Sequence, residues 1–217
     1  MMKRLIVTCE GPTEKEFCKD VLAPHFYNLG IAIEAPIIKH SGGGIVAWRI
    51  LKGQLENHLR ESDAVVTTFI DYYGIKQVHN FPSWDIAKNA PNNMDKVLIL
   101  EKAMKEDIKE RFRHRFIPHL QLHEFESLLF SDVNVFAKNF ADDEIDFMKL
   151  QKVVVQFPNP EDINNNPKTA PSARITDAVR GYSKVLDGNY LAMDIGLGKI
   201  RMCCPHFDEW VSSLENI

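Results

Sequence analysis

The sequence predicts an α/β fold in which a mostly parallel central sheet is flanked by helices and a C-terminal helical extension packs on it. Short apolar segments alternate with helical patterns along the first part of the chain, the order expected of parallel strands joined by crossover helices. These segments are nearly continuous in apolar residues, as in strands buried on both faces. Of the 217 residues, 45% are hydrophobic and 26% are charged, a composition that excludes intrinsic disorder.

Strands are expected over 5–7, 31–38 and 64–70, because each run is apolar and is bounded by charged or turn-forming residues. A fourth strand is expected over 116–122. Pro118 interrupts this strand, and since proline cannot donate a hydrogen bond to a neighbouring strand, we place it at or near a sheet edge.

The first helix is expected to begin at Pro12, where proline suits the first turn, and Pro24 is expected to end or kink it. The glycine turn 42–44 lacks the lysine and hydroxyl residue that end a P-loop, so we interpret it as a flexible connector. Segment 72–94 has no sustained periodicity and is longer than an ordinary connection, which indicates a functional loop. Further helical patterns cover 48–59, 95–112, 123–130, 144–155, 172–182 and 207–214.

One domain is expected over residues 1–217, with the sheet core in about 1–132 and the helical extension in 133–217. The segment 158–171 is rich in asparagine and proline and is a candidate boundary. The helices after it are too few to bury a core of their own, so we expect them to pack back on the sheet.

A reducing, cytoplasmic location without membrane association is expected. The apolar runs fall far short of the roughly 20 residues of a membrane-spanning helix, and the first residues lack the apolar length and cleavage site of a signal peptide. The four cysteines contain no Cys-x-x-Cys pair and are interpreted as reduced, mostly buried thiols.

Acidic residues follow the predicted strands. Glu10 follows the first strand, with Glu14 four residues later, Asp71 ends the third, and Glu124 and Glu126 follow the fourth. Because the carboxyl ends of parallel strands meet at one edge of a sheet, these carboxylates are expected to converge there. Clustered carboxylates repel, so at neutral pH one of them holds a proton or a cation neutralises the group.

Oxygen ligands favour Mg²⁺ or Mn²⁺, and such a site suits phosphoryl transfer, in which the metal neutralises charge that grows on phosphate oxygens. The alternative for Glu14 is that it only complements the dipole of the first helical turn.

The formal net charge of −4 excludes a basic nucleic-acid coat, so any phosphate-binding surface must be local. Arg174, near a predicted helix start, is the first candidate for a phosphate clamp. A second basic run, over 102–115, could follow a nucleic-acid backbone while Phe112 and Phe116 contact bases, but it is interspersed with acids, which favours a solvated helix face. The candidate phosphate-binding or nucleic-acid-binding residues are Lys168, Arg174, Arg180, Lys184 and Arg201.

Several motifs resemble those of a family of small bacterial proteins of unassigned function related to Toprim domains. They are Cys9-Glu10-Gly11-Pro12-Thr13-Glu14, Asp71-Tyr72-Tyr73-Gly74, His123-Glu124-Phe125-Glu126, Pro160-Glu161-Asp162-Ile163-Asn164 and Thr169-Ala170-Pro171-Ser172 with Arg174, and they span nearly the whole chain. The resemblance implies a Toprim-like, Rossmann-like sheet. It also implies Mg²⁺-dependent phosphodiester chemistry like that of phage-defence nucleases.

Carried over to this chain, the resemblance makes Glu10 the acid of the first motif, a metal ligand or general acid/base, and Glu14 the second glutamate of nuclease-type versions. Asp71 matches the first aspartate of the Asp-x-Asp motif, whereas Tyr73 stands at the second. Glu124 or Glu126 is then left to supply the missing carboxylate, and the expected metal ligands are Glu10, Asp71 and Glu124.

Three functions remain open. The first is a Mg²⁺- or Mn²⁺-dependent Toprim-like nuclease acting on DNA or RNA within a bacterial defence module. The second, suggested by Tyr73, is a catalytically weak binding module that acts through a separately encoded partner ATPase. The third is a small-molecule phosphohydrolase that uses the same acids.

Overall fold

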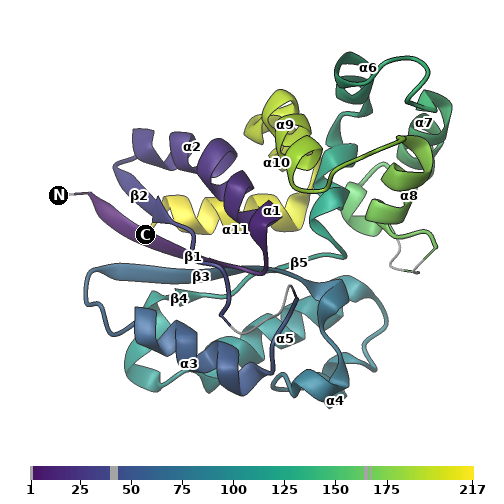
Figure 1. Ribbon diagram of the computed structural model, residues 1–217. Helices are drawn as coiled ribbons and strands as arrows, with labels where there is room; N and C mark the ends of the chain where they lie inside the picture. The colour runs from purple at the N-terminus through teal and green to yellow at the C-terminus, as the bar shows by residue number, and fades with distance from the viewer. Residues whose placement is uncertain (1, 40–43, 164–165, 167) are drawn as a thin grey trace.

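The fold is described from a computed structural model, which covers residues 2–39, 44–163, 166 and 168–217. The predicted glycine connector at 42–44 falls largely outside the described residues. Within the described residues, a parallel sheet of five strands forms the centre, in the order β2-β1-β3-β4, with β5 also pairing with β3 (Figure 1). The strands are β1 (Lys3–Cys9), β2 (Ile31–Glu34), β3 (Ala64–Asp71), β4 (Phe116–Ile117) and β5 (Leu120–Gln121).

The two central strands, β1 and β3, run in parallel register, with Cys9 opposite Phe69. Both strands are buried along most of their length, which is why their sequences are nearly continuous in apolar residues. Since the described pairings of the sheet are parallel, the residues that follow β1, β3 and β5 emerge at the same edge.

Helices cover both faces of the sheet, as Figure 1 shows. One face carries α1 (Pro12–Phe17), α2 (Ala23–Asn28), α9 (Leu186–Ile195), α10 (Leu197–Cys203) and α11 (Pro205–Glu215). The other carries α3 (Trp48–His58), α4 (Trp84–Ala87) and α5 (Asn93–Asp107). The helices α6 (Phe136–Asn139), α7 (Phe147–Gln156) and α8 (Pro171–Ala178) lie beyond the carboxyl ends of the strands. The predicted α/β class with a mostly parallel sheet is therefore confirmed.

The side chains of β1 alternate between two hydrophobic cores because successive strand residues face opposite sides of the sheet. Leu5 packs with Phe17 and with Phe207 of α11 in the first core. Ile6 packs with Leu51 of α3 in the second. The first core is built from both the N-terminal strands and the helices after residue 133, so the C-terminal extension covers one face of the sheet.

The boundaries of several elements differ from the sequence prediction. The strand predicted over 31–38 ends at Glu34, although Ile37 still bridges to Cys9. The predicted fourth strand is split at Pro118 into β4 and β5, which pair with β3 at the edge. Pro24 does not end the first helix. A π-helical turn, Cys18–Leu22, precedes Pro24. This local change in hydrogen bonding is consistent with proline, which has no backbone N–H to donate.

Short turns of helix occupy most of the remaining connections. The loop over 72–94 contains 3₁₀ turns at Tyr72–Gly74 and Gln77–His79 before α4. Further 3₁₀ turns follow at Glu110–Arg115, Phe125–Ser131, Val133–Val135 and Pro160–Asp162. In the described part of the chain, none of the helices combines the length and the apolar character needed to cross a membrane.

Candidate functional site: an acidic cluster at the carboxyl edge of the sheet

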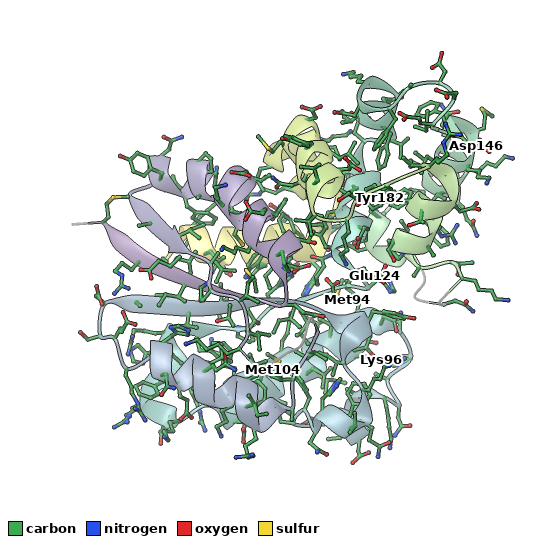
Figure 2. The ribbon with its side chains drawn as sticks, in the orientation of Figure 1. Met94, Lys96, Met104, Glu124, Asp146 and Tyr182 are labelled. Carbon is green, nitrogen blue, oxygen red and sulfur yellow. The ribbon has the colours of Figure 1, made fainter. Side chains whose placement is uncertain are left out.

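The predicted acids come together at the carboxyl edge of the sheet. We call the group the acidic cluster, and its members are Glu10, Glu14, Asp71, Glu124 and Glu126. Glu10 directly follows β1 and Asp71 is the last residue of β3, so the parallel pairing of these strands brings the two acids side by side. Figure 2 shows Glu124 at this edge, between the sheet and the C-terminal helices.

A direct contact joins the first two acids. The backbone N–H of Asp71 donates to Oε2 of Glu10 at 3.1 Å. Gly74 lies against the same carboxylate, since a Cβ atom at this glycine would meet Oε1 of Glu10 at 3.4 Å. Residues 61 positions apart therefore form one site, as the sequence predicted.

Backbone N–H groups orient three other carboxylates of the cluster. Gly11 donates to Oε2 of Glu14 at 2.8 Å, which places that side chain over the start of α1. Phe125 donates to Oδ1 of Asp71 at 2.9 Å. At the first turn of α8, Ser172 donates to Oε2 of Glu124 at 3.0 Å, so the C-terminal extension helps to position the cluster.

Glu126 is the most deeply buried acid of the cluster, with 0% of its surface exposed. Among the described residues, neither of its carboxylate oxygens has a hydrogen bond of good geometry. Its charge is balanced by Lys184, whose Nζ lies 3.1 Å from Oε2 of Glu126 and 3.8 Å from Oδ2 of Asp71. A buried carboxylate is costly without such a partner.

The pKa values of the cluster respond to this crowding. Burial and the charges of Glu14 and Glu124 raise the pKa of Glu10 to about 7, although the Asp71 amide and Lys184 act in the opposite direction. Burial also raises the pKa of Asp71 well above its usual range. The pKa of Glu126 is raised by its burial as well. Near neutral pH the group thus retains protons or requires a cation.

The hydrogen bonds described above leave oxygens available for a metal ion. Glu10, Glu14 and Glu124 each use one carboxylate oxygen in these bonds and keep the other. Asp71 keeps Oδ2, which faces Lys184. Carboxylate oxygens are the ligands that a hard divalent cation prefers, but among the described residues no three acids of the cluster place ligand atoms within 4.8 Å of one another, so their side chains would have to move together to hold such an ion.

The basic residues predicted to bind phosphate lie in different places. Of these, Lys184 is at the acidic cluster as an ion-pair partner. Arg174 donates from Nε to the backbone of Thr169 at 2.7 Å and lies over the ring of Phe157. Lys168 is exposed and lies in the turn that precedes α8. Arg180 pairs with Asp143 at 3.1 Å.

Arg201 is engaged away from the cluster. Its guanidinium pairs with Asp208 and Glu215 and donates to Ser212, all on α11. It serves there to hold α10 and α11 together. The basic run over 102–115 likewise contains structural contacts, since Arg115 donates to the backbone carbonyls of Leu59 and Ala64.

A cavity of about 570 Å³ lies beside the segment that precedes Glu124, although none of the five acids of the cluster lines it. Its lining includes His123, which is next to Glu124 in the chain, together with Met94 and Lys96 from the first turn of α5. Figure 2 labels both α5 residues below Glu124. His123 has a positive φ of 64°, and its carbonyl accepts from the backbone N–H of Tyr73 at 3.1 Å. The cavity has the size of a small-ligand pocket.

The sequence did not identify Lys184 as a partner of the acids or Tyr182 as their neighbour. The Tyr182 hydroxyl is buried and has no hydrogen bond among the described residues. Burial, followed by the charge of Glu126, raises its pKa well above the ordinary value. Both residues lie in an irregular segment between α8 and α9. The helix predicted over 172–182 ends at Ala178, so the predicted helical pattern did not place Tyr182 correctly.

A second group of metal-binding side chains lies outside the acidic cluster. Glu101, His119 and His206 each place one potential ligand atom within 4.8 Å of the others. This group could hold a metal ion. Its chemistry differs from that of the cluster, because two of its donors are imidazoles.

The fold and the acidic cluster define an α/β protein with carboxylates gathered at the carboxyl edge of a parallel, Rossmann-like sheet. The chain belongs to the family described as a domain of unknown function (DUF4276), whose model matches residues 9–215. Neither the curated proteins nor the solved structures include a match to the chain.

Proposed function

We propose that the chain is a Mg²⁺-dependent phosphodiesterase that cleaves DNA or RNA with Toprim-like chemistry. The observation that carries this proposal is the convergence of the acidic cluster, in which the Glu10 carboxylate accepts a hydrogen bond from the backbone of Asp71. Carboxylates buried together with one ammonium group carry excess negative charge, which a divalent cation would neutralise.

The expected ligands are Glu10, Asp71 and Glu124, which come from three separate strand ends. A bound Mg²⁺ or Mn²⁺ would supply Lewis-acid stabilisation of charge on phosphate oxygens. Backbone donors orient each of the three carboxylates, and their free oxygens would draw together when the cation binds.

Glu10 is also suited to proton transfer. Its pKa of about 7 allows it to accept or donate a proton near neutral pH. Glu14 lies on the first turn of α1, and its charge raises the pKa of Glu10. It would take the place of the second glutamate of nuclease-type Toprim domains.

The substitution of tyrosine at position 73 does not leave the site short of acids. The backbone of Tyr73 is tied to His123, and this contact brings the segment after β5 against the segment after β3. Glu124 and Glu126 both lie in the segment after β5. They are the candidates for the carboxylate that the Asp-x-Asp motif would otherwise supply.

The test is cleavage by the purified chain in Mg²⁺ or Mn²⁺, with plasmid, single-stranded DNA and RNA as substrates. Glu10→Gln is expected to lower the rate at least ~100-fold, because it removes a charged ligand while keeping an acceptor for the Asp71 amide. Glu16→Gln is the matched control, since Glu16 lies on the adjoining helix α1 and pairs with Lys19 at its surface. Cleavage that is equal in both variants would contradict the proposal.

The substrate class is resolved by the same preparation. Turnover of nucleotides or simple phosphate esters, with polynucleotides left intact, would favour the small-molecule phosphohydrolase instead. The proposed setting is a bacterial defence module, with nucleic acid as substrate.

Lys184 favours a second candidate, a binding module that needs no metal and acts through a separately encoded ATPase. Its ammonium already neutralises part of the cluster. Under the nuclease proposal, Lys184→Met removes a competing positive charge, so Mn²⁺ affinity rises at least ~10-fold. Under the alternative, Mn²⁺ does not bind measurably to either form, and association with the ATPase survives Glu10→Gln. Lys199→Met, an exposed site on α10, is the control.

A further inference from the structure

Three side chains from distant parts of the sequence meet at the sheet edge away from the acidic cluster. Glu101 comes from α5, His119 from the link between β4 and β5, and His206 from the first turn of α11. Helix α5 belongs to one core and α11 to the other. The group therefore lies where the two cores meet around the edge of the sheet.

The carboxylate of Glu101 stands between the two imidazoles. Its Oε1 lies 3.2 Å from Nε2 of His206 and 3.7 Å from Nδ1 of His119. The same oxygen accepts a hydrogen bond from the backbone of Leu120 at 2.7 Å, which fixes its position. The exposed fractions of the side chains are 12% for Glu101, 1% for His119 and 5% for His206.

We propose that Glu101, His119 and His206 form a binding site for a first-row transition cation such as Zn²⁺. Two imidazoles and one carboxylate are a donor set that suits this class of ion and is poorly suited to Mg²⁺. The site is distinct from the acidic cluster and does not depend on the proposed nuclease activity.

The spacing of the ligand atoms supports this assignment. Metal–ligand distances of about 2.0–2.2 Å at tetrahedral angles separate neighbouring ligand atoms by roughly 3.3–3.5 Å. The two distances from the Glu101 oxygen, 3.2 and 3.7 Å, bracket that range. The two imidazoles lie next to each other, with their ring centroids 4.9 Å apart, and one nitrogen of each lies within 4.8 Å of the other ligand atoms.

The surroundings prepare His119 to act as a ligand. Its other nitrogen, Nε2, is buried without a well-formed hydrogen bond among the described residues. The side chain of Gln121 interacts with the His119 ring. Trp210 stacks on the ring at 4.3 Å and restricts its rotation.

A cavity of about 170 Å³ lies beside the three side chains. Since a water molecule takes about 30 Å³ in the liquid, the cavity has room for a water as the fourth ligand. A site with three protein ligands and one exchangeable position is the arrangement of catalytic rather than purely structural zinc.

The test measures binding of Zn²⁺ and Co²⁺ alone to the full chain, freed of metal by a chelator. We expect one Zn²⁺ with a Kd tighter than about 1 µM. Co²⁺ should give the visible absorption of nitrogen and oxygen coordination, without a thiolate charge-transfer band. All binding measurements are made in the Glu10→Gln variant, so that metal binding at the acidic cluster does not add to the Zn²⁺ or Co²⁺ signal.

Two substitutions, Glu101→Gln and His206→Gln, are expected to weaken Zn²⁺ binding at least ~100-fold. Glu101→Gln keeps an acceptor for the Leu120 amide, so the fold should survive, and far-UV circular dichroism checks it. His25→Gln is the matched control, because His25 also pairs with a carboxylate, Glu215 at 2.6 Å. Zn²⁺ affinity weaker than ~100 µM, or equal in the folded Glu101→Gln variant, would overturn the proposal.

Discussion

Glu10 occupies a position in which the neutral carboxylic acid is favoured over the carboxylate. Burial, together with Glu14 and Glu124, raises its pKa from the ordinary 4.5 to about 7. The folded protein therefore binds this proton more tightly than the unfolded chain does. The resulting stability is fully present below about pH 4.5 and is lost as the pH rises through about 7.

We predict that ionisation of Glu10 destabilises the metal-free protein across this pH interval. Glu10→Gln should remove part of the loss and exceed the parent protein in free energy of unfolding at pH 8 by about 1–3 kcal/mol. Asp71 and Glu126, whose pKa values are also raised, add to the decline in the same direction. Urea unfolding in the presence of a chelator measures the effect.

Glu16→Gln serves as the control and should follow the parent protein at every pH. Saturating Mn²⁺ should restore stability to the parent protein above pH 7, because the ion binds the ionised form. A difference in free energy of unfolding between Glu10→Gln and the parent protein that does not grow from pH 4.5 to pH 8 would show that Glu10 does not hold its proton in this way.

At the scale of single residues, the sequence predicted the acids but not the ammonium group of Lys184 that pairs with them. Glu10 and Asp71 could be found because each directly ends an apolar strand, and parallel strands end together. Lys184 belongs to an irregular segment, so its proximity to Glu126 depends on how the C-terminal helices dock. Likewise, His119 and His206 meet only because β5 and α11 pack together, which no local pattern encodes.

Among the elements, α11 depends on a cap supplied from another part of the chain. The carboxylate of Glu161 accepts hydrogen bonds from the backbone N–H groups of His206 and Phe207, each at 2.9 Å. These groups are in the first turn, where no intrahelical acceptor is available. A negative charge there also complements the helix dipole.

We predict that Glu161→Ala lowers the free energy of unfolding by about 2–3 kcal/mol, because it leaves two buried N–H groups unpaired. Glu161→Gln, which keeps an acceptor oxygen, should lose less. The exposed Glu209→Ala on the same helix is the control and should change stability by less than about 0.5 kcal/mol. Equal stability of Glu161→Ala and Glu209→Ala in chemical denaturation would refute the capping role.

Helix α9 was not predicted, and its sequence explains why. It contains Gly188, a residue that weakens an isolated helix by about 1 kcal/mol relative to alanine. Packing favours the glycine, since a Cβ atom there would lie 3.0 Å from the Tyr182 hydroxyl, a tight contact. Tertiary contacts thus override a weak local preference. In contrast, α3 and α11 have regularly spaced apolar residues and were predicted.

For the molecule as a whole, the two sides of the sheet differ in how their cover is assembled. Helices α3 and α5, which follow the strands closely in sequence, cover one side. The other side needs α11, whose Trp210 stacks on Phe69 at 5.2 Å and donates to Thr67 at 2.8 Å. Phe207 completes the contact with Phe17 at 6.0 Å.

We predict that residues 1–132 do not fold alone, because this fragment leaves the aromatic face of the sheet uncovered. The full chain should unfold in a single transition, with tryptophan fluorescence and far-UV circular dichroism giving the same midpoint. As a control, the separately produced 133–217 fragment is mixed with 1–132. Recovery of folding in the mixture would show that the 1–132 fragment lacks covering contacts and that its sheet is not damaged. A native-like thermal transition of 1–132 by itself would contradict this view.

The fold class could be predicted from the sequence because the strands are apolar runs with helices between them. The strand order could not, since it depends on pairings such as Asp71 with Gln121, 50 residues apart. The position of α11 over the first core was expected only in general terms. Its contacts with Phe17 and Phe69 needed the three-dimensional structure.

The late position of α11 in the chain has a consequence for biosynthesis. While the ribosome is still translating, Phe17 and Phe69 have already left the exit tunnel, but the helix that buries them has not been made. From the time Phe69 emerges until α11 is made, the nascent polypeptide therefore carries an exposed aromatic surface that can associate with other chains.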